Sequence, residues 1–525
     1  MRFITGAAAA IFVLAGFACA QSNDTQPAHA QSAADEGTRE VAVNSASDAK
    51  VEARLVALEQ KIQQLELENQ QLKAEQIELR NRINAASQVR PAPTSAPVDL
   101  SSRLEEIGER GDLLQHNANA KEAPGVTAGR DTFSIVSPDK NFRLRFGGHV
   151  QMDGKSFIDR QGVPLINVFN IRRARAILEG DLGRFVSFRF MPEFGNGSNS
   201  IYDAYADLKL TPYTVLRGGK FKTPLGLELL QNDADRTFIE QSLTNNLVPN
   251  RDEGFQLYGD IRGRLAYQAA VLNGAPAGGN IDGIAPTGAT THNGKDVVGR
   301  IFATPFARGG QPLLKGLGFG IAASTGRQDE NAVLPNFKSA AGQATFFTYS
   351  GTQSVTNIIA DGRRLTYSPQ AHYYAGPFGL MAEYVTLRQQ IAGTNAAGEM
   401  INQAVDDHAW QIAGSWVITG EQKTFRGVVP RTGLEGGNIP LGIGAWELAA
   451  RYSELTIDPT AFTVGFADST KSANSARAWC VGLNWYLNYF TRLAFNYEQT
   501  RFGQGAVIGN RPTEHAVMER LQIAF

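Results

Sequence analysis

The chain has 525 residues, of which 54 are glycine, 9% are aromatic and only 19% are charged, and its 50 Lys+Arg nearly balance its 51 Asp+Glu. The balanced charge shows no excess of basic residues of the kind that nucleic-acid binding requires. Beyond residue 20, no apolar run reaches the ~18 residues that a membrane helix needs. With only two cysteines, a disulfide-rich secreted domain is excluded as well. Abundant glycine and aromatic residues indicate many strands joined by turns.

The N-terminal residues 1–20 have the pattern of a secretory signal peptide. A positive Arg2 precedes the apolar stretch 6–16, and Ala18-Cys19-Ala20 forms a small-residue cleavage site. Two alternatives stay open, a second cleavage site at Ala28-His29-Ala30 and lipidation of Cys19. Cleavage after Ala20 leaves Cys480 alone, so we expect no internal disulfide and a protein exported from the cytoplasm.

Residues 21–50 are polar and are predicted to be disordered. Residues 51–84 follow a heptad pattern with Leu at most d positions and with Asn69 and Gln76 at a positions, which predicts an α-helical coiled coil. We expect this segment to lie in the periplasm as an oligomerising stalk. A lone helix packed on its own barrel and a tether to the cell envelope are the alternatives. Residues 85–130 are predicted to be a linker.

Residues 131–525 alternate between apolar and polar side chains as membrane strands do. In 142–153, Phe142, Leu144, Phe146, Val150 and Met152 share one face, and the arginines, His149, Gln151 and Asp153 share the other. In 202–210, Tyr202 falls on the apolar face and Asp203 on the polar face. Lipid outside and water inside would explain this pattern, and a sheet in lipid must close on itself.

The segment holds 395 residues, and at about 25 residues per strand it predicts a transmembrane antiparallel β-barrel of about 16 strands, an all-β fold. Its last strand ends in Phe525, like the signal that barrels present to their assembly machinery. Glu519 interrupts the apolar face of this strand. We interpret it as a bulge or an interfacial position, because a carboxylate facing lipid is costly.

Basic residues on the predicted inner face suggest the chemistry of the channel. Residues 131–525 carry a net charge of about +3, and the densest basic cluster is Ile171-Arg172-Arg173-Ala174-Arg175. Guanidinium is weakly hydrated, always charged and donates in pairs to oxyanions, so a basic constriction favours anions. Alternatively, acidic residues pair with these cations and the pore is a general one. The residues predicted to face the lumen are Arg143, Arg145, His149, Arg173, Arg175, Arg189, Lys220 and Lys222.

The chain resembles the phosphate-selective porin O and P family of outer-membrane barrels. The similar stretches lie in order along the barrel: FRLRFGGHVQMD (142–153), IRRARAILEG (171–180), YDAYADLKL (202–210), GGKFKTPLGLELL (218–230), TGE (419–421), GAWELAARY (444–452), GLNWY (482–486) and the closing RLQIAF (520–525).

The resemblance implies a homotrimer with one pore per subunit, narrowed by a loop that folds inward, here 228–253. It implies a pair of constriction arginines at Arg172 and Arg173. The family's first-strand arginine falls on His149, which is charged only part of the time near pH 7, and its loop arginine falls near neutral Gln241. We therefore expect anion preference with weakened phosphate binding, or another small solute. The same loop carries Asp233, Asp235 and Glu240 against Arg236 and Arg251.

These observations predict an outer-membrane porin of a Gram-negative cell that passes small anions, with phosphate as a candidate solute. The expected pore residues are Arg143, Arg145, His149, Arg172, Arg173, Arg175, Lys220 and Lys222. The expected partners are small anionic solutes, outer-membrane lipid, further copies of the chain and, through Phe525, the assembly machinery. No histidine lies in a nucleophile motif or has zinc-ligand spacing, so no enzymatic activity, metal or cofactor is expected. A general porin tethered to the envelope by the coiled coil is the alternative.

Overall fold

The computed structural model describes residues 124–129, 132–158, 165–197, 199–281, 293–309, 311–332, 334–434 and 442–525. The predicted signal peptide, disordered segment and coiled coil lie outside the described residues, as does most of the predicted linker. Everything described belongs to one compact unit.

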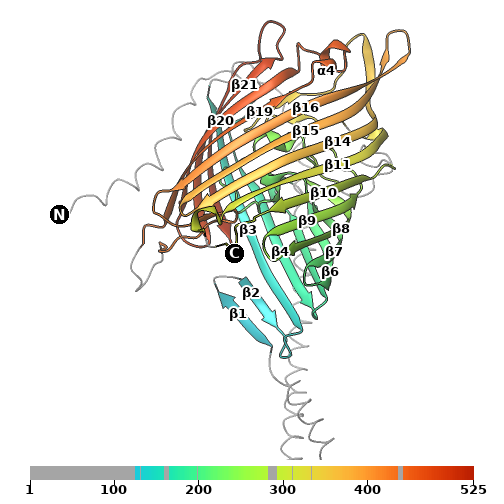
Figure 1. The fold of residues 1–525 in the computed structure, drawn as a ribbon. Helices are drawn as coiled ribbons and strands as arrows, with labels where there is room; N and C mark the ends of the chain where they lie inside the picture. The colour runs from blue at the N-terminus through green and yellow to red at the C-terminus, as the bar shows by residue number, and fades with distance from the viewer. Residues whose placement is uncertain are drawn as a thin grey trace, which may run out of the picture. The chain divides into compact units, whose positions relative to one another are not determined.

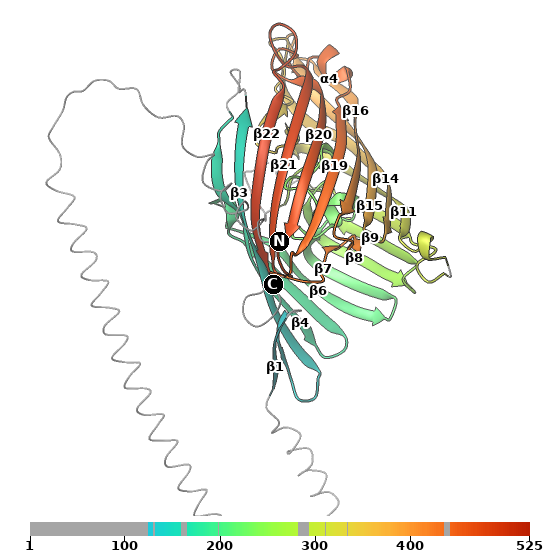
Figure 2. The ribbon, with the colours of Figure 1, turned by 90° about the vertical axis from the view of Figure 1, so that its left-hand side faces the viewer.

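Sixteen described strands form a closed antiparallel barrel (Figures 1 and 2), which confirms the predicted fold class. The last strand pairs with the first, from Ala524 opposite His149 to His515 opposite Ile158. The barrel strands are β3 (Phe142–Ile158), β4 (Val168–Leu182), β5 (Val186–Glu193), β6 (Ser200–Thr211), β7 (Thr214–Lys222), β8 (Arg251–Ile261), β9 (Leu265–Leu272), β10 (Asp296–Ala303), β11 (Leu317–Ala332), β14 (Val355–Ala375), β15 (Phe378–Asn395), β16 (Met400–Val417), β19 (Ala445–Thr456), β20 (Ala473–Tyr486), β21 (Thr491–Gln504) and β22 (Glu514–Ala524).

The remaining elements are short. Among the described residues, no helix has both the length and the apolar character needed to cross a membrane. A hairpin of β1 and β2 extends the sheet beyond the barrel by pairing with the start of β3 (Figure 1). These elements are β1 (Gly125–Gly129), β2 (Thr132–Val136), β12 (Phe337–Lys338), β13 (Thr345–Phe347), β17 (Lys423–Thr424), β18 (Gly427–Val428), α3 (Leu227–Leu230), α4 (Thr460–Thr463), η1 (Gly195–Gly197), η2 (Leu243–Asn246) and η3 (Pro312–Leu314).

The two ends of the barrel differ in their connections. The turn end holds Phe525, whose backbone exchanges two hydrogen bonds of 2.9 Å with Gly148. The loop end, opposite, holds the long connection 223–250 between β7 and β8. Strands vary from 8 residues in β5 to 21 in β14, so the wall is much taller on one side than on the other.

Side chains alternate across the wall as the sequence predicts. In β3, Val150 and Met152 face outward and are about half exposed, whereas His149, Gln151 and Asp153 are buried inside the barrel. Tyr202 is an exception. A register shift between β5 and β6 adds a residue at this point, and the Tyr202 ring lies against two interior guanidiniums, 4.2 Å from Arg175 and 4.0 Å from Arg251. Its predicted outward position is wrong because the bulge reverses the alternation.

The interior has two unlike halves, one rich in ion pairs and one with an apolar core. The charged half lies along β3 to β8 and contains most of the arginines discussed below. The other half, called the apolar half, lies along β9 to β21, where large apolar side chains pack against the connections that fold into the barrel. Charged residues such as Glu383, Glu447 and Arg451 are buried among them. The buried apolar residues of this half include Leu225, Leu243, Leu247, Phe337, Phe346, Val385, Ile391, Val405, Leu455, Phe466 and Phe502.

The position of Glu519 also differs from the predicted one. The pairing of β22 with β21 runs without interruption from Glu514 to Ile523, so Glu519 is not in a bulge. It lies in mid-strand on the outer face, between Val517 and Leu521, both more than 40% exposed. Its side chain covers Gly154 of the neighbouring strand, where an added Cβ would lie 2.6 Å from the Glu519 carboxylate.

Candidate functional site

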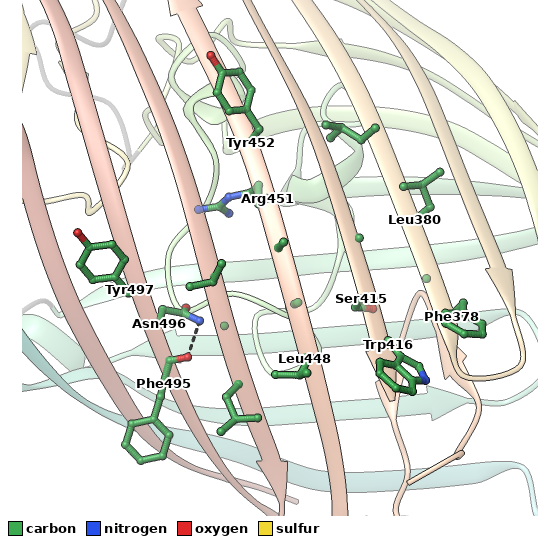
Figure 3. A pocket seen from close by; sticks show the side chains of 18 of the residues that line it. Phe378, Leu380, Ser415, Trp416, Leu448, Arg451, Tyr452, Phe495, Asn496 and Tyr497 are labelled. Carbon is green, nitrogen blue, oxygen red and sulfur yellow. Dashed lines mark hydrogen bonds between the residues drawn. The ribbon is translucent and has the colours of Figure 1, made fainter. Parts of the chain in front are cut away.

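The outer wall has the surface of a membrane protein. A hollow of about 1120 Å³ lies on the outside of β15 to β22 and is lined by apolar side chains such as Leu380, Leu448 and Val481. Figure 3 shows Phe378 and Trp416 near one end of this hollow and Tyr452 and Tyr497 toward the other. An apolar band flanked by aromatic side chains is typical of lipid-facing barrels. This hollow therefore faces lipid and is separate from the pore.

The connection 223–250 folds into the barrel, as predicted for 228–253. Its helix α3 is held at its N-terminus by Glu383 of β15, which accepts hydrogen bonds from Leu227 N at 2.6 Å and Glu228 N at 3.3 Å. Glu228 in turn pairs with Arg451 of β19 at 3.2 Å. Carboxylates suit the unpaired N–H groups at a helix N-terminus. Wall residues of β15 and β19, which flank β16 on one side of the barrel, thus hold the loop inside the lumen.

Two further connections enter the lumen, which the sequence analysis did not foresee. From the loop end, the segment 334–354 places the carbonyl of Ala341 2.7 Å from Lys155 Nζ. From the turn end, the segment 418–434 brings Lys423 within 2.6 Å of Glu447 and 2.8 Å of Thr237 Oγ1, near the tip of the first connection. Apolar residues such as Phe337, Phe346 and Phe347 were the available sequence signal, since loops exposed to water rarely carry them.

A β-bulge in β4 explains how two consecutive arginines both face inward. Gln151 of β3 pairs with Arg173, but the next residue, Met152, pairs with Ile171, so Arg172 is the extra residue. Arg173 donates to Gln151 Oε1 at 2.8 Å, and Arg172 donates to Glu240 at 3.1 Å. The structure therefore brings together the pair that the family resemblance implies. Such re-aiming of side chains is a usual effect of bulges next to functional sites.

Asp233, in the inward connection, is the centre of the arginine cluster. It pairs with Arg175 and Arg236, and Arg173 Nε lies 3.8 Å away. Burial raises the pKa of Asp233, but the guanidiniums of Arg236, Arg175 and Arg173 outweigh it and hold this pKa well below its usual value. Arg175 also pairs with Glu193 at 2.5 Å. The pairing of lumen arginines with acids, weighed as an alternative in the sequence, is thus present.

A second carboxylate, Glu240, neutralises the other side of the cluster. It accepts from Arg172 and, at 2.7 Å, from Lys155. Burial raises the pKa of Glu240, and the nearby charges of Arg172 and Lys155 lower it well below its usual value. Both carboxylates therefore remain ionised at neutral pH, and the cluster contains more cations than anions.

These groups surround a polar cavity of about 270 Å³ inside the barrel. Among the described residues, six basic and two acidic side chains line it. Arg236 and Arg251 were expected only as loop charges, and Lys338 was not predicted to lie here. Arg236 donates to the side chain of Gln241, the position where the family's loop arginine was expected. The basic residues are Arg172, Arg173, Arg175, Arg236, Arg251 and Lys338, and the acids are Asp233 and Glu240.

The other predicted pore residues lie away from this cavity. His149 is buried opposite Arg175 in the β3–β4 pair. Lys222 is inside the barrel and donates to the carbonyls of Leu229, at 2.8 Å, and Gln231, at 2.5 Å, so it holds the inward connection.

Three residues that were predicted to face the lumen, Lys220, Arg143 and Arg145, lie on the outer face or outside the closed part of the barrel. Lys220 pairs in register with Ala204 and Glu253, on the same face as exposed Phe255, so its strand position faces outward, although the residue itself is only 6% exposed. Arg143 and Arg145 lie on the inner face of β3 but before its pairing with β22 begins at His149. Arg143 is consequently exposed, and Arg145 pairs with Glu179 at 3.5 Å while remaining 38% exposed.

A closed barrel with a lipid-facing outer band and a polar, mostly basic cavity in its interior defines an outer-membrane channel of the porin class. Residues 142–525 match the family model of the phosphate-selective porins O and P. The chain therefore belongs to this family. It is an outer-membrane channel protein for anions and not an enzyme.

Individual relatives are more distant. Porin O of Pseudomonas aeruginosa strain PAO1 is 23% identical over 403 residues, which is 70% of this chain and 85% of that protein. Among solved structures, OmpT of Vibrio cholerae has a TM-score of 0.47 at 11% identity, covering 76% of this chain and all of that one. An anion-selective porin of Comamonas acidovorans has a TM-score of 0.42 at 11% identity, covering 73% and 100%.

Proposed function

We propose that this porin passes small monovalent anions in preference to cations and binds phosphate only weakly. The excess of basic side chains around the 270 Å³ cavity supports the anion preference. Cations that line a narrow passage lower the barrier for anions and raise it for cations. Weak phosphate binding follows from the pairing of the guanidiniums with Asp233 and Glu240, since a phosphate would compete with carboxylates that already occupy their donors.

Arg172 is the arginine that we expect to contact passing ions. Its side chain is 30% exposed, compared with 7% for Arg173 and 2% for Arg175. The buried arginines position the inward connection, and Arg172 presents charge to the water in the cavity. Lys222 has the same positioning role, and we assign His149, Arg143, Arg145 and Lys220 no direct contact with the solute.

The test is the reversal potential of purified protein in a planar bilayer under a KCl gradient. An anion-selective sign supports the proposal and a cation-selective sign rejects it. A unit charge about 6 Å from an ion contributes roughly 0.7 kcal/mol in water, so Arg172→Gln should lower chloride entry about threefold and raise potassium entry by a similar factor. Arg143→Gln, which removes an exposed arginine beyond the barrel, is the matched control and should leave the potential unchanged.

We also propose that the chain assembles as a homotrimer through the outer face around β22 and β3. Glu519 supports this. In the described part of the chain it has no ion pair or hydrogen bond, and its neighbours Val517, Leu521 and the 71% exposed Phe169 are apolar. A carboxylate facing lipid is unfavourable, whereas a subunit contact can supply a polar partner. Lipid would cover the other outward faces, and Phe525 would serve as the signal for barrel assembly.

Glu519→Ala should lower the trimer fraction in mild detergent, measured by native electrophoresis and light scattering. Glu454→Ala removes another outward carboxylate, one already paired with Arg477 at 2.7 Å, and should leave the trimer intact. An unchanged trimer in Glu519→Ala would contradict this choice of interface, and a monomeric wild-type protein would contradict the trimer itself.

A further inference from the structure

The part of the cavity that is open to a solute is rich in carboxamides. Asn245, Asn246, Asn250 and Asn280 line it together with Ser242 and Ser339. The four asparagines are only partly buried, whereas the side chains of Arg175, Arg236 and Arg251 are 2–4% exposed. The charged groups that a solute can reach are therefore Arg172 and the exposed Lys338. This surface offers more neutral hydrogen-bonding groups than charges.

Several of these polar groups have unused hydrogen-bonding capacity. Asn280 Oδ1 is buried and has no hydrogen-bond partner among the described residues. The Asn280 backbone forms a bridge with Arg251, at the cavity wall. Asn250 Oδ1 accepts from Arg251 at 3.1 Å, and among the contacts of the described residues its amide nitrogen donates to none. Buried polar groups are normally satisfied, so unsatisfied amide groups indicate a place for a hydrogen-bonding ligand.

The carboxylates of the cavity favour the same kind of ligand. Asp233 and Glu240 both line it and remain ionised, so a second negative charge on a solute would be repelled. Carboxamides both donate and accept, as hydroxyl groups do. The cavity volume of about 270 Å³ corresponds to roughly nine liquid water molecules, which is far more than a five-atom oxyanion requires.

We infer that the cavity binds a hydroxylated organic monoanion, such as a sugar acid or another polyhydroxy carboxylate. Arg172 and Lys338 hold its carboxylate, and the carboxamides of Asn250 and Asn280 bond its hydroxyl groups. This inference rests on the proposed anion preference and adds the class of solute. It differs from phosphate recognition because neutral hydroxyl groups, and not total charge, supply the selectivity.

The experiment measures block of the chloride current through the full-length protein in a planar bilayer. The probes are gluconate, which has five hydroxyl groups, hexanoate, which has the same number of carbons and none, and inorganic phosphate. Gluconate should reach half-block at a concentration about tenfold below those of hexanoate and phosphate. Equal or stronger block by phosphate or hexanoate would overturn the inference.

Two variants locate the site. Asn280→Ala should reduce the preference for gluconate over phosphate about fivefold, as expected for the loss of one or two hydrogen bonds. Lys338→Gln should weaken the block by gluconate and by phosphate alike. Asn141→Ala, an exposed turn residue that bonds Asp139, is the control and should change neither.

The outcomes also separate this inference from the proposed function. A channel that is anion-selective but shows no gluconate preference, or one whose preference survives Asn280→Ala, contradicts only the inference. A cation-selective reversal potential contradicts the proposed function as well. Correct folding of each variant is checked by its heat-modifiable mobility on gels, so that loss of block is not confused with loss of the barrel.

Discussion

The two halves of the barrel interior use the same strand geometry for opposite purposes. In the charged half, along β3 to β8, inward residues such as Arg175 and Asp203 form ion pairs with acids and with Arg251. In the apolar half, inward residues such as Val385 and Leu455 pack against Leu243 and Phe466 of the connections. The comparison shows that an inward-facing residue of a barrel strand need not contact water. A connection that folds into the barrel can cover such residues and form a hydrophobic core with them.

The inward connection 223–250 lies between the two halves. It presents charged side chains to the charged half and apolar side chains to the apolar half. Asp233, Arg236 and Glu240 face the arginines of β4, while Leu243 and Leu247 enter the apolar half. If this division is correct, substitutions on the charged side of the inward connection should change ion selectivity, whereas substitutions on its apolar side should change only the stability of the protein. The following three predictions test this division, in order of expected effect.

The largest effect is expected for Asp233→Asn. The substitution leaves Arg175, Arg236 and Arg173 without their shared carboxylate, and breaking a buried ion pair costs about 3–5 kcal/mol. Denaturant unfolding in detergent micelles should show this loss, and the reversal potential should shift toward stronger anion preference. Asp139→Asn, in an exposed turn, is the control. An unchanged selectivity would mean that the cavity does not set the ion preference.

Leu243→Ala should affect stability without affecting selectivity. Leu243 is fully buried in the apolar half, and removing such a side chain costs about 3 kcal/mol through lost burial and the cavity left behind. The same unfolding measurement checks this, with Leu313→Ala at a 73% exposed leucine as the matched control. If Leu243→Ala shifts the reversal potential, the apolar half contributes to the conducting path and the division is wrong.

The smallest effect is a pH dependence at the tip of the inward connection. Burial raises the pKa of Asp235 to about 6, so it is neutral at pH 5 and charged at pH 7.5. Its added negative charge should reduce anion preference by less than about twofold over this interval, and Asp235→Asn should diminish the change. Asp233 and Glu240, with lowered pKa values, stay ionised over the same range, and their stabilising contribution is lost only as pH falls below about 4. A steep change between pH 5 and 7.5 in Asp235→Asn would contradict these assignments.

The alternation of side chains determined much of the architecture. The pattern over 142–153 gave the correct faces of β3, because a strand sends successive residues to opposite sides. Segment length predicted about sixteen strands. The pairing of lumen acids with arginines could also be anticipated, because the alternation places acidic and basic residues on the same face of neighbouring strands. These inferences depend only on local geometry, which the sequence carries directly.

Tertiary structure decided what local alternation cannot encode. A bulge at Arg172 lets two consecutive arginines face inward, and a bulge at Tyr202 reversed its expected face, because one extra residue shifts a strand of period two by half its period. The strand position of Lys220 faced outward because of its register with Ala204, and Arg143 lay beyond the closing strand. The cavity itself joins residues of β4, β6 and β8 with three connections. Sequence thus determined the barrel, and only long-range pairing and the infolding of the connections decided which charges a solute can reach.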